Sequence, residues 1–192
     1  MSISTSLASA LRALVVPHVP LSEEQISGLS AHFELLLKWN QKMSLTTVTD
    51  PVEAATRHYG ESLLLAQRLT PGSVVDIGSG AGFPGIPAAI MRPDCRFDLV
   101  ESNQRKAVFL REAVRSLAGV RVLAQRADVL PGKYDWVVSR AVAIPDVLSL
   151  GLATGVALLI GESDAAGLSG FEITRLPWGD RRVLAIRSRC ST

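Results

Sequence analysis

The sequence predicts an α/β protein in which a mostly parallel sheet follows an N-terminal helical extension. From residue 73 onward the apolar pattern alternates between strand and helix, whereas the first seventy residues carry helical signals. A glycine-rich turn also follows directly after a buried strand, as ligand-binding parallel sheets require. A chain of 192 residues, 47% of them hydrophobic, is long enough for one such domain and an extension. We therefore predict an extension or lid over 1–70 and an α/β domain over 71–192.

Two helix starts are readable in the extension. Ser22 and Gln25 form a capping box. Apolar residues then recur at helical spacing: Ile26, Leu29, Phe33, Leu36 and Leu37. A second helix begins at Asp50, with Pro51 at its first position, and runs to about Leu69, before a Pro-Gly pair.

The α/β part contains seven predicted strands. They are 73–77, 96–101, 120–124, 134–139, 156–160, 171–176 and 182–187, with helices over 85–91, 103–118 and 145–153. Alternation of strands and helices indicates a parallel sheet covered on both faces. The link between the last two strands, with Pro177 and Gly179, is short enough for an antiparallel hairpin. Seven strands ending in a hairpin are the topology of class I methyltransferases, whereas dehydrogenases have six parallel strands.

The glycine turn predicts a nucleoside cofactor. Gly78, Gly80 and Gly82 let the backbone bend sharply and approach a ligand without an intervening Cβ atom. Asp76 lies at the carboxyl end of the preceding strand, where open parallel sheets bind ligands. Glu101 ends the next strand and is placed to accept hydrogen bonds from ribose hydroxyls.

The details of the turn favour S-adenosylmethionine over a dinucleotide. The third glycine comes one residue earlier than in the Gly-x-Gly-x-x-Gly fingerprint that seats a pyrophosphate. Asp76, ahead of the first glycine, suits the cationic methionyl ammonium group, directly or through water. Asp128, after the third strand, is placed to accept from the adenine amino group. The alternative is a structural glycine turn with ordinary strand-end acids.

The chemistry expected of such a site is an in-line methyl displacement, which needs mainly proximity and alignment. A heterocyclic ring nitrogen is a suitable acceptor because its free lone pair needs no general base. The chain has neither an Asn-Pro-Pro-Tyr-like clamp nor a cysteine in a strand-end motif, and Cys95 precedes a strand, which predicts a structural role. With Cys190 as its only companion, it predicts neither a disulfide framework nor a metal site.

Charge distribution and targeting signals bear on the partner and the cellular compartment of the protein. Residues 1–70 have a net charge of −1 and residues 71–192 a net charge of +3. Six cations lie close together in the sequence: Arg105, Lys106, Arg111, Arg115, Arg121 and Arg126. They form either a phosphate-facing surface or a solvated helix face. No secretory signal and no membrane-spanning run is visible, so we expect a cytoplasmic protein.

Several segments resemble the bacterial ribosomal RNA small subunit methyltransferase G family, also called glucose-inhibited division protein B. They are Leu37-Lys38-Trp39-Asn40, Leu45-Thr46, Asp50-Pro51, Arg57-His58 with Ser62, 76–87, Phe109-Leu110 and Ser139-Arg140-Ala141. The resemblance spans about residues 30–160. It implies methyl transfer from S-adenosylmethionine to N7 of a guanine in the 530 loop of 16S ribosomal RNA. The partner would be that RNA or the small-subunit particle.

The resemblance also implies roles for individual residues. By the resemblance, the cofactor is contacted by Gly78, Phe83, Ala127, Asp128 and Arg140. These residues add to Asp76, Gly80, Gly82 and Glu101 from the glycine turn and the strand ends. Arg140 and Asn40 are the catalytic candidates, because a fixed guanidinium beside the methyl group can hold a phosphate or a guanine edge. Lys38, Arg57 and His58 are the RNA-binding candidates. In the structural alternatives, His58 caps or packs and Asn40 ends its helix.

The chain departs from the family at three places. Glu61 stands where members usually have Asp, and Ile160-Gly161 where they usually have Lys-Gly. The segment 162–170 is too short for the usual helix. Two other functions therefore stay open: methylation of a small molecule or protein, and ribosome assembly by a weakly catalytic cofactor-binding factor. No heptad or large apolar stripe demands a protein partner, so we predict a monomer.

Overall fold

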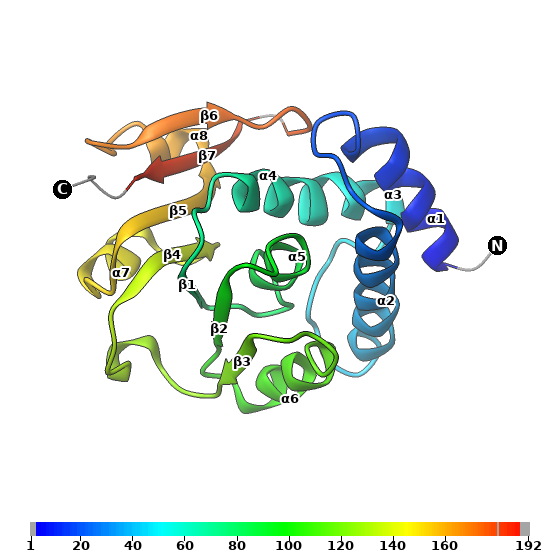
Figure 1. The fold of residues 1–192 in the computed structure, drawn as a ribbon, viewed down its shortest axis with the longest axis horizontal. Helices are drawn as coiled ribbons and strands as arrows, with labels where there is room; N and C mark the ends of the chain where they lie inside the picture. Colours follow the sequence, from blue (N-terminus) through cyan, green and yellow to red (C-terminus); the bar gives the residue numbers. More distant parts are fainter. Residues whose placement is uncertain (1–2, 180, 189–192) are drawn as a thin grey trace.

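A computed structural model describes residues 3–179 and 181–188, so Cys190 lies outside the described residues. Seven strands form one sheet in the order β3-β2-β1-β4-β5-β7-β6 (Figure 1). The strands are β1 (Ser73–Ile77), β2 (Arg96–Val100), β3 (Val120–Leu123), β4 (Tyr134–Arg140), β5 (Ala153–Gly161), β6 (Glu172–Arg175) and β7 (Arg182–Arg187). The first five pair in parallel, and β7 runs antiparallel to both β5 and β6. The predicted class I topology with its terminal hairpin is confirmed.

The helical signals of the N-terminal segment are also confirmed. The helices there are α1 (Ile3–Ala10), η1 (Leu11–Val15), α2 (Glu23–Asn40), α3 (Pro51–Ala54), η2 (Ala55–Gly60) and α4 (Glu61–Gln67). Ser22 and Gln25 form the predicted capping box, and the Asp50 side chain accepts from the backbone N–H groups of Val52 and Glu53. The helix from residue 51 runs to Gln67, with a π-helical turn in its middle.

Of the later helices, the one predicted over 85–91 has these bounds in the structure, and two others are shorter than the periodicity predicts. These later helices are α5 (Gly85–Met91), α6 (Gln104–Ala113), a 3₁₀ turn (Ala127–Val129), α7 (Ile144–Ser149) and α8 (Glu162–Ala165). The expected helix 103–118 ends at Ala113, because Val114 already leaves the helical conformation, and the expected helix 145–153 ends at Ser149. The segment after β5 does hold a helix, of four residues.

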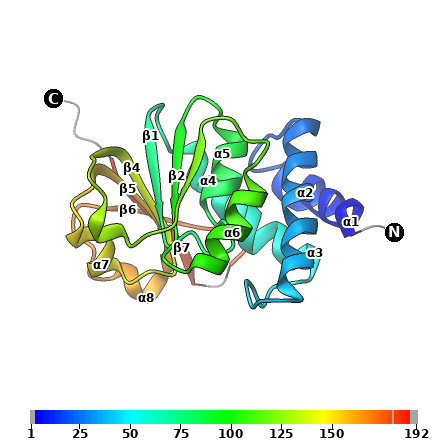
Figure 2. The same cartoon turned by 90° about the horizontal axis from the view of Figure 1, so that it is seen from below.

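The molecule is layered around the sheet. Helices α4, α5 and α6 cover one face and α7 and α8 the other, while α1 and α2 pack outside α5 and α6 (Figure 2). Successive residues of β1 supply the two cores, since Val74 belongs to the cluster on the α5 side and Val75 to the cluster on the α7 side. No helix among the described residues is long and apolar enough to cross a membrane.

The extension shares its core with the sheet. Phe33 and Tyr59 from the first seventy residues belong to the same buried cluster as Phe83 and Phe109. The division at residue 70 therefore stays a prediction about domains. In the structure, hydrophobic side chains from both sides of that boundary pack together.

Candidate active site

The turn after β1 depends on three glycines in backbone conformations that other residues rarely adopt. Gly78, Gly80 and Gly82 have φ values of 72°, 55° and 89°, a region that residues with a Cβ rarely adopt. A Cβ atom on Gly78 would lie 2.6 Å from Cγ2 of Val142. The Gly80 N–H donates to Oε2 of Glu101 over 3.0 Å, which fixes the turn against the end of β2.

A first cavity of about 460 Å³ lies beside this turn, across the ends of β1, β2 and β4. Four of the predicted cofactor residues line it: Gly78, Glu101, Ala127 and Asp128. The Asp128 carboxylate is half exposed and pairs with Arg126 at 3.1 Å. The sequence had not singled out Gln125 or Val142, which also line this cavity.

A second cavity, of about 300 Å³, lies on the other side of the turn. It is lined by Gly80, Phe83 and Arg140 from the predicted cofactor set, and by His58 from the predicted RNA set. Thr46 and Lys106 line it as well. The two cavities share Gly78, Glu101 and Val142 in their walls, so a ligand in the first adjoins the second.

His58 and Arg140 form a connected unit in the wall of the second cavity. The His58 ring stacks on Phe83, with centroids 4.4 Å apart, and its Nδ1 accepts from Nη1 of Arg140 at 3.0 Å. Because a guanidinium group only donates, Nδ1 carries no proton. Burial, with the charges of Arg140 and Arg57, lowers the pKa of His58 to about 3. The neutral ring therefore has its proton on Nε2, which donates to Oγ1 of Thr46 at 2.8 Å.

The end of β4 directs the Arg140 side chain toward His58. The Ser139 hydroxyl donates to the Ile77 carbonyl, which ties β4 to β1, and Arg140 also donates to the Arg57 carbonyl over 2.9 Å. Ala141 follows with a φ of 62°, a strained value for a residue other than glycine. Burial lowers the pKa of the Arg140 guanidinium. The Ser-Arg-Ala segment is therefore a sharp turn that holds one partly buried cation in the cavity wall.

Three of the residues predicted to act on or bind the methyl acceptor, Asn40, Lys38 and Arg57, do not line either cavity. The Asn40 amide is engaged by backbone: Oδ1 accepts from the N–H groups of Leu45 and Thr46, and Nδ2 donates to the Thr46 carbonyl. Lys38 is exposed in the last turn of α2. The Arg57 side chain is exposed and pairs with Glu53. Asn40 thus holds Thr46, the residue that contacts His58.

Asp76 and Gly82 lie behind the turn, outside both cavities. Oδ2 of Asp76 accepts from the Gly85 N–H at 3.1 Å, whereas its buried Oδ1 has no hydrogen-bond partner. Burial raises the pKa of Asp76 to about 7. A Cβ atom on Gly82 would lie 2.4 Å from Cδ1 of Ile86, so this glycine serves packing. A contact between Asp76 and a cofactor ammonium group stays a prediction.

Sequence reasoning missed two buried polar links to the site. Nε2 of His32 donates to the Ala81 carbonyl at 3.2 Å and Nδ1 accepts from the Tyr59 hydroxyl at 3.0 Å, which joins α2 to the glycine turn. Glu61, only 1% exposed, accepts from Nη2 of Arg182 at 2.9 Å. No local motif surrounds His32 or Arg182, and Glu61 stood out only as a departure from the family.

Ile160 lines a separate cavity of about 780 Å³ beyond the 141–148 segment. Its neighbours there include Ile144, Pro145, Leu148 and Leu168, and Arg182 lies at the edge. The position at which the resemblance led us to expect a lysine is therefore apolar here and faces away from the His58–Arg140 unit, on the α7 side of the sheet.

The residues around the first two cavities fit S-adenosylmethionine. Gly78 and Gly80 leave backbone exposed where a Cβ atom would stand, and Glu101 and Asp128 supply carboxylate acceptors in the wall of the first cavity. The unpartnered oxygen of Asp76 lies behind the same turn and suits a nearby cation. The strand order and this site together define a class I methyltransferase, whose cofactor is S-adenosylmethionine.

Comparison with known proteins identifies the family. Residues 25–152 match the rRNA small subunit methyltransferase G family, and the chain belongs to it. A Ribosomal RNA small subunit methyltransferase G from Xanthomonas campestris pv. campestris (strain B100) is 38% identical over 187 residues, which cover 93% of this chain and 84% of that protein. One of the same name from Dichelobacter nodosus (strain VCS1703A) is 45% identical over 129 residues, covering 65% of this chain and 61% of that protein.

Solved structures share the fold at low identity. A ribosomal protein L11 methylase from Lactobacillus delbrueckii subsp. bulgaricus superimposes with a TM-score of 0.55 and 16% identity, covering 75% of this chain and 88% of that one. The 23S rRNA methyltransferase ErmE gives a TM-score of 0.51 and 16% identity, over 68% and 67% of the two chains. These two likenesses support the fold alone.

Proposed function

We propose that the chain transfers a methyl group from S-adenosylmethionine to N7 of a guanine in the 530 loop of 16S ribosomal RNA. One observation supports this acceptor beyond the family: of the described residues that line the second cavity, the one imidazole and the one carboxylate both already have hydrogen-bond partners. Both ring nitrogens of His58 are engaged, and the Glu101 carboxylate accepts from the N–H groups of Gly80 and Asn103. A ring nitrogen with a free lone pair needs no base.

The chemistry is an in-line displacement. S-adenosylmethionine supplies an electrophilic methyl group; the N7–carbon bond forms as the carbon–sulfur bond breaks, and no proton leaves. The residues of the chain orient the reactants. Glu101 accepts from ribose hydroxyls, Asp128 accepts from the adenine amino group, and the neutral His58 holds Arg140 where its remaining N–H groups can bind the acceptor.

The N-terminal segment supplies the acceptor side of the site. Asn40 acts through Thr46 and His58 on the direction of Arg140, so we assign it a positioning role within the catalytic pair predicted from the sequence. Lys38 is exposed and offers positive charge to RNA outside the cavity, and the exposed Arg57 would exchange its ion pair with Glu53 for a phosphate there. We further propose that the protein acts in the cytoplasm as a monomer on the RNA or on the small-subunit particle.

The test is the methylation state of the 530 loop in cells. Mass spectrometry of this 16S RNA fragment from a strain lacking the gene should show one methyl group fewer, restored by the wild-type gene and not by Arg140→Ala. An unchanged fragment in the deletion strain would exclude this target. Transfer to naked RNA and to purified small subunits, compared in vitro, then identifies the substrate form.

A second candidate function is ribosome assembly by a weakly catalytic cofactor-binding factor. The departure at Ile160 suggested it, but Ile160 lines a separate cavity on the α7 side of the sheet, so this departure removes no cation from the site around Arg140. Single-turnover transfer from labelled cofactor to unmodified small subunits separates the two functions. Product formed at a rate compatible with the cell cycle excludes the weakly catalytic alternative.

A further inference from the structure

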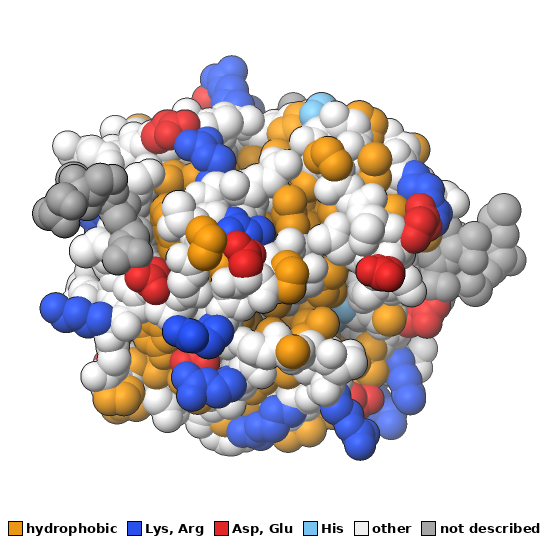
Figure 3. All heavy atoms as spheres, viewed as in Figure 1, with side chains coloured by type: hydrophobic (Ala, Val, Ile, Leu, Met, Phe, Trp, Pro, Cys, Tyr) orange, Lys and Arg blue, Asp and Glu red, His pale blue; other side chains and the backbone are white. Residues whose placement is uncertain are grey.

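The positive charge of this chain is concentrated in one segment. Residues 96–133 contain eight Lys or Arg and four Asp or Glu, a net charge of +4, so the other residues sum to −2 against the total of +2. This segment comprises β2, α6, β3 and the connection to β4. Side chains of Lys and Arg lie along the lower margin of the molecule, over α6 and β3 (Figure 3). The charge is therefore a feature of one flank.

The cations of this flank are largely uncommitted. Most exposed arginines elsewhere are ion-paired, such as Arg12 with Glu23 and Arg68 with Glu172. Among the described residues of the flank, Arg121 pairs with Asp98 and Arg126 with Asp128. The others form no ion pair within the described part of the chain: Arg96, Arg105, Lys106, Arg111, Arg115 and Lys133. Their charge is available to a partner.

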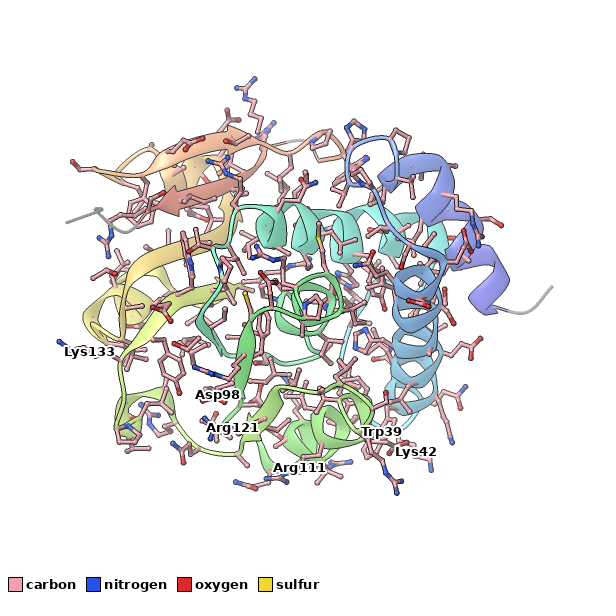
Figure 4. All side chains as sticks on the ribbon, viewed as in Figure 1. Trp39, Lys42, Asp98, Arg111, Arg121 and Lys133 are labelled. Atoms are coloured by element: carbon pink, nitrogen blue, oxygen red, sulfur yellow. The ribbon has the colours of Figure 1, made fainter. Side chains whose placement is uncertain are left out.

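Three of these charges lie along α6 and the turn after it, and the end of α2 adds a fourth. Arg105, Arg111 and Arg115 are exposed along α6 and the turn after it, and Lys42 is exposed beyond the end of α2. We call these four residues the α6 surface; in Figure 4, Arg111 on α6 and Lys42 beyond the end of α2 both lie along the lower margin of the molecule. The indole N–H of Trp39 donates to Glu112 at 3.1 Å, which engages the acid of α6 and joins the two helices.

The α6 surface begins at the mouth of the active site. Lys106, next to Arg105, lines the second cavity together with Arg140. Ten residues of α6 extend about 15 Å from there, a length that matches several phosphate spacings along a nucleic acid strand. A polyanion whose reacting group occupies the cavity can therefore follow the helix away from it.

We propose that the α6 surface binds the phosphate backbone of the RNA whose base enters the active site. Three of its four cations are arginines, whose planar guanidinium groups bind phosphate oxygens through two hydrogen bonds at once. The inference rests on the proposed RNA substrate and adds where that RNA runs. RNA contacts on α6 act through charge and position the substrate, and they take no part in the methyl transfer step.

The test compares two triple variants that remove equal charge at different places. Arg105→Gln/Arg111→Gln/Arg115→Gln removes three of the four cations of the α6 surface. Arg12→Gln/Arg68→Gln/Arg175→Gln neutralises three exposed arginines in η1, directly after α4 and at the end of β6, whose exposed ion pairs contribute little stability. The probe is a 16S RNA transcript carrying the 530 loop, titrated without cofactor over a range of salt. Cofactor affinity, measured by calorimetry, checks that each variant is folded.

We expect the α6 variant to weaken RNA binding at least about tenfold near 0.1 M salt. The slope of log K against log salt should be less steep by about 2, since each lost phosphate contact removes about 0.7–0.9. The control should change binding less than about threefold. Equal losses of RNA affinity in the two variants would overturn the proposal. A wild-type protein that binds neither the transcript nor the small subunit would also overturn it, and the partner of the α6 surface would then be an acidic protein. RNA that binds through α6 without being methylated contradicts only the proposed function.

Discussion

The cofactor side of the active site is formed mainly by backbone, whereas the acceptor side is formed by side chains. On the cofactor side, the glycine turn after β1 presents backbone, fixed by one carboxylate, Glu101, at the end of the next strand. On the acceptor side, side chains far apart in the sequence hold one another: Arg140 binds His58, and His58 binds Thr46. The first side is a property of a short segment, and the second exists only when the extension is packed on the sheet.

This difference decided what the sequence could predict. Helix caps and the glycine turn are local patterns, so Ser22, Asp50 and residues 78–82 were predicted and found. The class of cofactor followed from the same local pattern. Helix ends were less accurate, because α6 stops at Ala113 without a glycine or proline to mark it.

The acceptor side was predicted by resemblance, and its geometry was not. Arg140 and His58 are 82 residues apart, and Glu61 and Arg182 are 121 apart, so no spacing rule connects them. Asn40 illustrates the limit: the sequence singled out the residue, but only packing shows that its amide holds Thr46. His32 had no motif around it, yet it bridges α2 and the glycine turn.

The largest effect should come from the ion pair between Arg182 and Glu61, the buried carboxylate whose charge acts on Arg140 of the acceptor side. Arg182→Met leaves the Glu61 carboxylate buried without its partner, which should lower the free energy of unfolding by about 3–5 kcal/mol. Urea unfolding measures it. The double variant Glu61→Gln/Arg182→Met removes both charges and should recover most of the loss. If the double variant is as unstable as Arg182→Met, the isolated carboxylate is not the cause.

On the cofactor side, Gly80→Val should weaken S-adenosylmethionine binding at least about 100-fold. Valine disfavours a φ of 55°, and its side chain would enter the cavity, because the nearest protein atom to a Cβ there is 3.7 Å away. Gly132→Val is the control, since a Cβ at Gly132 meets nothing within 4 Å. Unchanged affinity in calorimetry would remove Gly80 from the cofactor site.

A substitution on the acceptor side should lower the rate of methyl transfer more than it lowers cofactor affinity. We expect Arg140→Ala to lower the single-turnover rate about 30- to 100-fold, the loss typical of one fixed donor at a reacting centre, and to weaken cofactor binding less than about tenfold. Arg187→Ala is a matched control, because that guanidinium lies over Phe171 in a part of the chain outside both cavities. A loss confined to cofactor affinity would make Arg140 a cofactor ligand only.

The smallest effect is a pH dependence of stability. His32 and His58, with pKa values of about 4 and 3, stay neutral in the folded chain while the unfolded chain protonates near pH 6.5. Each should therefore cost about 1.5 kcal/mol of stability as the pH falls from 6.5 to 5. Asp76, with its raised pKa of about 7, binds a proton when folded and offsets about one histidine over that range.

Unfolding by urea at the two pH values checks this balance. We expect the wild-type chain to lose about 1.5 kcal/mol in total, because two histidines oppose one aspartate. His58→Phe keeps an aromatic ring on Phe83 and should make stability nearly independent of pH over this range. A His58→Phe chain that loses as much stability as the wild type would show that His58 is not held neutral by burial.

Single-turnover methyl transfer by the purified protein tests most directly whether the two sides form one active site. Unmodified small subunits and naked 16S RNA are offered with labelled S-adenosylmethionine, and the modified atom is located by mass spectrometry and by cleavage specific to 7-methylguanosine. We predict 7-methylguanosine at a single guanine of the 530 loop. Cofactor binding without transfer to either substrate, or a methyl group on a different atom or nucleotide, would contradict the account.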